Sequence, residues 1–115
     1  MPLQSTDTIA DYHAHVYFDS PEQRRAAEAL RGELNQRFDV FVSRLVDRPI
    51  GPHPTPMFEV AFDPSMFATI VPWLMLNRDG LSILVHPNTG FAKADHLVNA
   101  LWLGQPKELI VGPLL

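Results

Sequence analysis

The sequence predicts an α+β fold in which the elements follow the order strand, helix, strand, strand, helix, strand. Residues 12–18 and 57–62 alternate apolar with polar side chains, which is the pattern of a half-buried strand. Residues 20–37 and 63–80 carry apolar residues three and four positions apart, which is the pattern of an amphipathic helix. Prolines and glycines between these segments mark the boundaries of the elements.

The first predicted strand, residues 12–18, has two different faces because successive side chains of a strand point in opposite directions. Its apolar face consists of Ala14, Val16 and Phe18. The opposite face consists of His13, His15 and Tyr17. Two imidazoles on one face of a strand lie side by side, which makes them a usable pair of metal ligands.

A helix is predicted next, because Ser20 can cap it, Pro21 suits its first turn and Gln23 completes a capping box. The helix ends near Arg37, and its apolar stripe consists of Ala27, Leu30 and Leu34. Residues 38–46 mix β-branched and aromatic side chains and are predicted to form the second strand.

Four prolines, at positions 49, 52, 54 and 56, follow the second strand and cannot sustain a helix or a strand ladder. We therefore expect an extended, stiff loop that holds His53 between two prolines. The third strand is predicted at residues 57–62, and its alternation places Glu59 on the more polar face.

The second helix is predicted to start at Pro64 and to stop at Gly80, with a kink or a restart at Pro72. The fourth strand is predicted at residues 81–85, and the HPNTG stretch after it reads as a turn. A short terminal helix is predicted at residues 94–102.

This element order is that of the ferredoxin-like βαββαβ sandwich, in which right-handed crossovers bring the first and third strands to the middle of the sheet. The predicted sheet is antiparallel with strand order 4-1-3-2, and the helices cover one face. The opposite face is then predicted to collect four side chains that can bind metal. These are His13, His15, Glu59 and His86.

Two histidines and one carboxylate form the facial ligand set of non-haem Fe(II) centres, which keeps other coordination positions open. We expect any three of the four residues to bind the metal, because the strand registers that choose among them cannot be read from the sequence. His53 and His96 lie outside the strands, where an unligated imidazole can move a proton to or from a substrate. Simpler interpretations remain: a solvated Glu59, a structural clamp at His53 and local hydrogen bonding at His96.

Composition narrows the class of protein. With 115 residues and no cysteine, we expect one domain spanning residues 1–115 and neither disulfides nor thiolate metal sites. A net charge of −4 with only nine lysines and arginines argues against nucleic acid as a partner. No segment approaches the roughly 18 apolar residues of a membrane helix. We therefore expect a cytoplasmic protein with no membrane partner.

Four motifs of the chain resemble one known family. They are YHAHVYF, GPHPTPMFEVAF, PWLMLNRDGLSILVHPNTG, and the closing DH with ALWLG. Over residues 12–104 the chain resembles the DOPA 4,5-dioxygenase family. The resemblance implies a small ferredoxin-like enzyme that cleaves the ring of DOPA or a related catechol in the extradiol manner, using O₂ and Fe(II), with zinc as an alternative metal. It also implies that His53 or His96 assists proton transfer.

Two other functions are compatible with the sequence. The first is a non-enzymatic ferredoxin-like dimer with a structural zinc site, which would have four protein ligands and no open position. The second is a metal-free module that binds a small aromatic molecule in an apolar pocket. We also expect a homodimer, because a sheet with one uncovered face is easily completed by a second copy.

Overall fold

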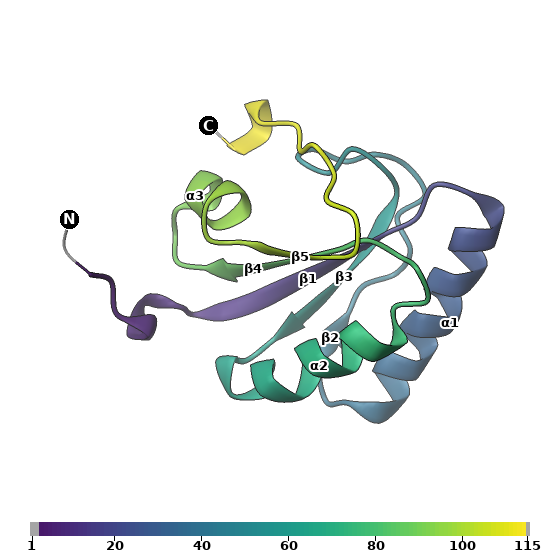
Figure 1. Cartoon of the computed structure of the whole chain (residues 1–115), viewed down its shortest axis with the longest axis horizontal. Helices are drawn as coiled ribbons and strands as arrows, with labels where there is room; N and C mark the ends of the chain where they lie inside the picture. The colour runs from purple at the N-terminus through teal and green to yellow at the C-terminus, as the bar shows by residue number, and fades with distance from the viewer. Residues whose placement is uncertain (1–2, 115) are drawn as a thin grey trace.

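The computed structural model describes residues 3–114. Within this part of the chain, a five-stranded antiparallel sheet has the order β2-β3-β1-β4-β5 (Figure 1). The strands are β1 (Asp11–Tyr17), β2 (Phe41–Val42), β3 (Met57–Phe62), β4 (Ile83–Asn88) and β5 (Leu101–Leu103). The helices are α1 (Pro21–Arg37), α2 (Phe67–Asn77) and α3 (Ala92–Leu97). Short 3₁₀ turns lie at Thr6–Thr8, Pro64–Met66 and Gly112–Leu114.

The predicted α+β fold is confirmed, and its first four strands keep the predicted neighbours, since 2-3-1-4 is 4-1-3-2 read from the other edge. The fifth strand was not predicted. The helix expected at residues 94–102 is wrong in its second half, because α3 ends at Leu97 and β5 pairs with β4 from Leu101 to Leu103. An apolar run suits either state. Here the free edge of β4 supplies hydrogen-bond partners, and the run becomes a strand.

The second strand is much shorter than the predicted residues 38–46. The ladder between β2 and β3 stops at Ser43, whose hydroxyl accepts the backbone N–H of Glu59 at 2.8 Å. The chain pairs again only at Val46, which forms an isolated bridge to Met57. A side-chain hydrogen bond therefore replaces part of the ladder that β-propensity alone predicts.

The fourth strand is longer than predicted and continues through His86 to Asn88, where the sequence indicated a turn. Pro87 is tolerated in β4 because β5 pairs only as far as Val85, which leaves that end of β4 as an edge. The second helix does not restart at Pro72, since α2 runs unbroken past it.

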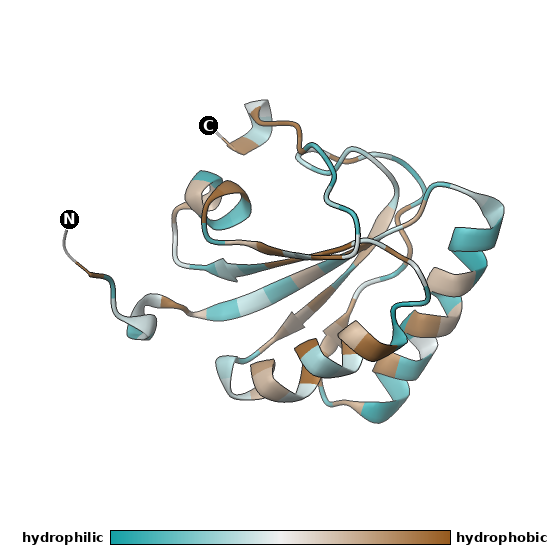
Figure 2. Ribbon diagram, in the orientation of Figure 1, coloured by the Kyte–Doolittle hydropathy of each residue, from teal (hydrophilic) through white to brown (hydrophobic). Residues whose placement is uncertain are grey.

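The main core lies between the sheet and the helices α1 and α2, which cover the same face as predicted (Figure 1). The start of α1 forms as predicted, with the Ser20 hydroxyl accepting the Gln23 backbone N–H at 3.1 Å. Figure 2 shows apolar and polar segments alternating along α1, the mark of a helix with one buried stripe. Fully buried core residues include Ala14, Val16, Val60, Ile83, Leu34, Ile70 and Leu74.

Other elements partly cover the opposite face of the sheet. The helix α3 and the C-terminal segment lie on the side away from α1 and α2 (Figure 1). A small apolar cluster sits on this face at the C-terminal end of β1 and consists of Tyr17, Met57, Leu84 and Leu109. The polar side of the sheet is therefore a partly enclosed site rather than an open surface.

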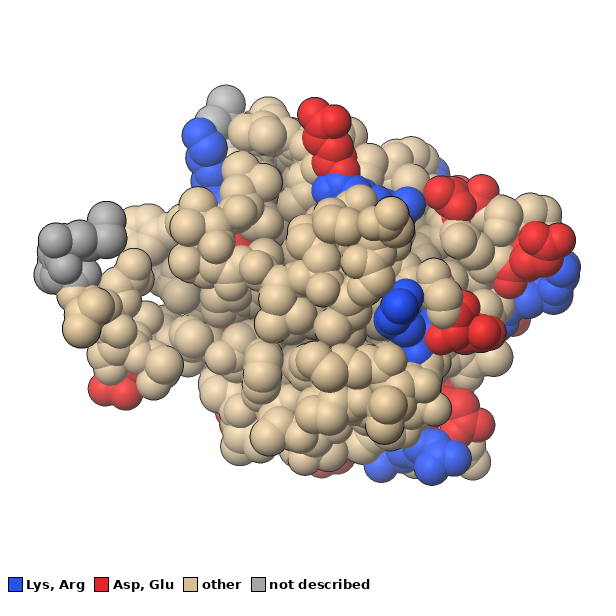
Figure 3. Space-filling model, viewed as in Figure 1, with Lys and Arg blue, Asp and Glu red and all other residues tan. Residues whose placement is uncertain are grey.

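Figure 3 shows charged groups of both signs at the margin and over the right-hand part of the face in view, and a broad uncharged area over its centre and left. No helix within residues 3–114 is long and apolar enough to cross a membrane.

Candidate metal centre

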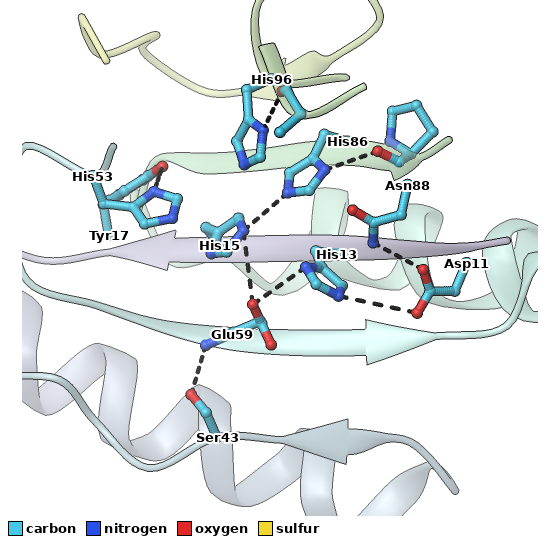
Figure 4. A network of polar contacts seen from close by, with 12 residues as sticks. Asp11, His13, His15, Tyr17, Ser43, His53, Glu59, His86, Asn88 and His96 are labelled. Atoms are coloured by element: carbon cyan, nitrogen blue, oxygen red, sulfur yellow. Dashed lines mark hydrogen bonds and ion pairs between the residues drawn. The ribbon is translucent and has the colours of Figure 1, made fainter. Parts of the chain in front are cut away.

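The pairing of β1 with β3 and with β4 brings the four predicted metal ligands together. His13 lies opposite His86 of β4, and His15 lies opposite Glu59 of β3. All four side chains point to the face away from α1 and α2 (Figure 4). The convergence predicted from strand alternation and strand order is thus present.

His15 and His86 form the tightest pair of this group. Their Nε2 atoms are 3.0 Å apart, and the two residues are only 3% and 1% exposed. Glu59 lies on the other side of His15, with its Oε1 3.2 Å from Nδ1 of His13 and 3.9 Å from Nε2 of His15. The carboxylate therefore faces two of the imidazoles at once (Figure 4).

The remaining two histidines reach the same place from outside the sheet. The His53 ring lies 4.0 Å from the ring of His15, and the His96 ring lies 3.9 Å from the ring of His86, measured between centroids. Two overlapping triads have ligand atoms within 4.8 Å of one another. They are His13, His15 and His86, and His15, His53 and His96. His15 is common to both triads, and all five histidines of the chain meet in one cluster.

The segments that carry His53 and His96 are anchored locally. The backbone N–H of His53 donates to the carbonyl of Ile50 at 2.8 Å. At the start of α3, the buried carboxylate of Asp95 accepts the backbone N–H of Thr89 at 2.8 Å and its hydroxyl at 2.7 Å. These contacts fix α3 to the end of β4, so that His96 is held over the sheet.

Backbone carbonyls determine which nitrogen of two histidines carries the proton. Nδ1 of His86 lies 3.0 Å from the Pro87 carbonyl, and Nδ1 of His96 lies 2.7 Å from the Ala92 carbonyl. A carbonyl can only accept, so both Nδ1 atoms are the N–H donors and both Nε2 atoms keep a lone pair. This arrangement, with Nδ1–H bonded to a carbonyl, is the usual outer support of a metal-binding histidine.

The cluster favours neutral imidazoles. Burial holds the pKa of His15 well below its usual value, and the neighbouring His53 and His86 lower it further. Burial likewise lowers the pKa of His53 and of His86 to about 4. Three adjacent imidazoles that are neutral at physiological pH present lone pairs, which is the state that metal binding requires.

Two observations indicate that the histidine cluster can hold a metal ion. Metal–nitrogen bonds of about 2.0–2.1 Å place two adjacent nitrogens of an octahedral centre roughly 3 Å apart, and the Nε2 atoms of His15 and His86 are separated by 3.0 Å. In addition, Nδ1 of His15 is buried without a hydrogen-bond partner. An orphaned buried polar atom is a common mark of an ion or water site.

Comparison with known proteins shows which family this chain belongs to. A model of the Dopa 4,5-dioxygenase family matches residues 12–112, which include all five histidines. The chain belongs to this family. It is 36% identical over 104 residues to the DOPA 4,5-dioxygenase of Amanita muscaria, covering 84% of this chain and 46% of that protein. It is 38% identical over 108 residues to an uncharacterized 21.2 kDa protein of Botryotinia fuckeliana, covering 86% of this chain and 59% of that protein.

The chain thus spans about half the length of the curated relatives it matches. A solved structure matches nearly the whole chain. A crystal structure from Nostoc punctiforme, described as a "putative dioxygenase", superposes with a TM-score of 0.92 at 52% identity, covering 95% of this chain and 94% of that one. The resemblance inferred from the sequence motifs is confirmed, and so is the α+β fold.

Two features of the cluster were missed from the sequence. Tyr17 was placed on the histidine face but given no role, and its hydroxyl lies 2.7 Å from Nδ1 of His53. The bond between Asp95 and Thr89 that anchors α3 was also missed. The alternation of β1 signals Tyr17, whereas nothing in the local sequence signals that Asp95 is only 2% exposed.

Proposed function

We propose that this protein is a metal-dependent extradiol dioxygenase that opens the ring of DOPA or a related catechol. The observation that carries the proposal is the convergence of five histidines on one partly enclosed face, two from β1, one from β4, one from a loop and one from α3. Burial lowers the pKa of three of them, His15, His53 and His86. Membership of the Dopa 4,5-dioxygenase family and the likeness to the Nostoc structure support it.

His15 and His86 are the proposed core of the ligand set, because they are the most buried and their Nε2 atoms face each other. His13 or Glu59 supplies the third ligand, and the other of the two supports it through their 3.2 Å contact. Fe(II), or zinc in its place, suits this set of nitrogen and oxygen donors. When bound, Fe(II) would supply the redox chemistry for O₂ and a Lewis acid for the catechol oxygens.

The protein's own residues would move protons and exclude water. Nε2 of His96 keeps a lone pair, because Nδ1 donates to the Ala92 carbonyl, and can accept the proton of a catechol hydroxyl. The apolar cluster around Tyr17 borders the site on one side and keeps water from it. Glu59 supplies the negative charge that partly balances a bound cation.

The test is anaerobic reconstitution of the metal-free protein with Fe(II), followed by oxygen uptake and visible absorbance with DOPA and with simple catechols. We expect a coloured ring-opened product from the wild-type protein, and loss of both metal binding and oxygen uptake in His15→Ala and His86→Ala. Leu76→Ala is the control, because Leu76 is 86% exposed on α2, across the sheet from the cluster.

Absence of oxygen consumption with every catechol, despite bound Fe(II), would refute the dioxygenase proposal. Zinc bound tightly by four protein ligands, with the same lack of activity, would support the structural zinc site instead. Comparison of His13→Ala with Glu59→Gln in metal titrations identifies the third ligand, since the variant that loses more affinity has lost a direct bond to the metal.

A further inference from the structure

His53 differs from the other histidines in the partner of its Nδ1. His86 and His96 each bond through Nδ1 to a backbone carbonyl, which can only accept a hydrogen bond. The Nδ1 partner of His53 is the Tyr17 hydroxyl at 2.7 Å, which can donate as well as accept. The position of the Tyr17 proton therefore decides whether the other ring nitrogen of His53, Nε2, carries a proton or a lone pair.

The surroundings of Tyr17 determine where its proton goes. Tyr17 is only 1% exposed, and among residues 3–114 the hydroxyl makes no hydrogen bond other than the one to His53. If His53 donated to it, the buried phenolic proton would be left without an acceptor, which is an unfavourable arrangement. The satisfied arrangement has the Tyr17 O–H donating to Nδ1, which leaves the imidazole proton on Nε2 of His53.

The packing of Tyr17 leaves its ring little freedom to move to another partner. It stacks on Trp102 of β5, with ring centroids 5.7 Å apart and an angle of 27° between the rings. Met57, Leu84 and Leu109 enclose it on the same face. The hydroxyl is thus held at a fixed position beside the His53 ring, which itself lies against His15.

We propose that Tyr17 is a positioning residue that fixes His53 as the Nε2–H tautomer, so that His53 presents a hydrogen-bond donor to the substrate and not a lone pair to the metal. His53 and His96 then have opposite roles, since His96 presents a lone pair at Nε2. The role toward a substrate rests on the proposed function, whereas the tautomer is a property of the protein itself. The assignment also favours the triad of His13, His15 and His86 as the metal site over the triad that contains His53.

The first test is the tautomer of His53 measured by two-bond ¹H–¹⁵N correlation NMR on the metal-free protein near pH 7.5. In the wild-type protein we expect the shift of an unprotonated nitrogen at Nδ1 and of a protonated nitrogen at Nε2. In Tyr17→Phe we expect a mixture of tautomers. Tyr12→Phe is the matched control, because Tyr12 is the other tyrosine of the chain and packs on Phe62 and Phe67 across the sheet.

A protonated Nδ1 in the wild-type protein, or an unchanged tautomer in Tyr17→Phe, would overturn the proposal. This measurement does not depend on activity. A wild-type protein that consumes no oxygen would refute the proposed function and leave the tautomer assignment to be judged by NMR.

The second test separates positioning from a purely structural role. In the Fe(II)-loaded enzyme, Tyr17→Phe is expected to lower kcat by at least about 10-fold, as for a misplaced proton donor, with KM and Fe(II) affinity unchanged. Adding Tyr17→Phe to His53→Ala is expected to cause no further loss, because Tyr17 acts through His53. If Tyr17→Phe lowered kcat equally in the wild-type protein and in His53→Ala, or lowered Fe(II) affinity in parallel with kcat, Tyr17 would not act by positioning His53.

Discussion

The buried histidines make the metal-free protein sensitive to mild acid. Burial lowers the pKa of His53 and of His86 from the ordinary 6.5 to about 4. The unfolded chain takes up protons at these residues below about pH 6.5, whereas the folded chain takes them up only near pH 4. The stabilisation from the neutral imidazoles is therefore complete above pH 6.5 and is lost as the pH falls toward 4.

The size of the effect follows from these values. The full shift from 6.5 to about 4 corresponds to roughly 3 kcal/mol of folding free energy for each imidazole. Between pH 7.5 and pH 5.5 the loss is about 1.3 kcal/mol for each, or about 2.6 kcal/mol for the two. His15, whose pKa is also lowered, adds to this loss. Asp47 and Asp63 have pKa values lowered below 3.8, so their protonation changes the free energy of unfolding only at pH values below this range.

The assay is urea unfolding followed by far-UV circular dichroism at pH 7.5 and 5.5, with chelator present to keep the protein metal-free. His53→Gln and His86→Asn should each remove about half of the pH dependence that the two histidines cause. A free energy of unfolding that is the same at both pH values would refute the reasoning, and so would variants that keep the full pH dependence of the wild-type protein.

Three further predictions concern stability measured by the same unfolding assay. Asp95→Asn should lower the free energy of unfolding by about 1–3 kcal/mol, because the buried carboxylate accepts two hydrogen bonds from Thr89, and an unchanged value would show that this contact does not anchor α3. Ser20→Ala should cost about 1 kcal/mol through loss of the α1 cap, with Ser20→Gly expected to cost only a few tenths. Leu34→Ala should cost about 2–5 kcal/mol, because Leu34 is fully buried in the main core, whereas Leu76→Ala on the exposed side of α2 should change stability by less than about 0.5 kcal/mol. Similar effects of the two leucine substitutions would contradict the placement of the core.

Much of the candidate site could be predicted because it depends on strand alternation and strand order. The period of two put His13 and His15 on one face of β1, and the crossover rule brought β3 and β4 beside β1. Glu59 and His86 then had to face the same side. These inferences need only local patterns and a small set of allowed topologies.

The meeting of His53 and His96 with this cluster could not be predicted in the same way. His53 lies in a loop whose path depends on its contact with Tyr17, and His96 lies on a helix whose placement depends on the buried bond between Asp95 and Thr89. Loops and short helices carry no periodic signal of which face they will cover. Their positions follow from contacts between residues far apart in the chain.

The sequence by itself determined the α+β class, the neighbours of the first four strands and the two faces of β1, because hydrophobic periodicity and handed crossovers act locally and repeat along the chain. The tertiary structure decided that residues 101–103 form a strand, that β4 continues through His86, and that Tyr17 meets His53. Each of these depends on a hydrogen-bond partner supplied by a distant part of the chain. Such partners exist only once the sheet has formed.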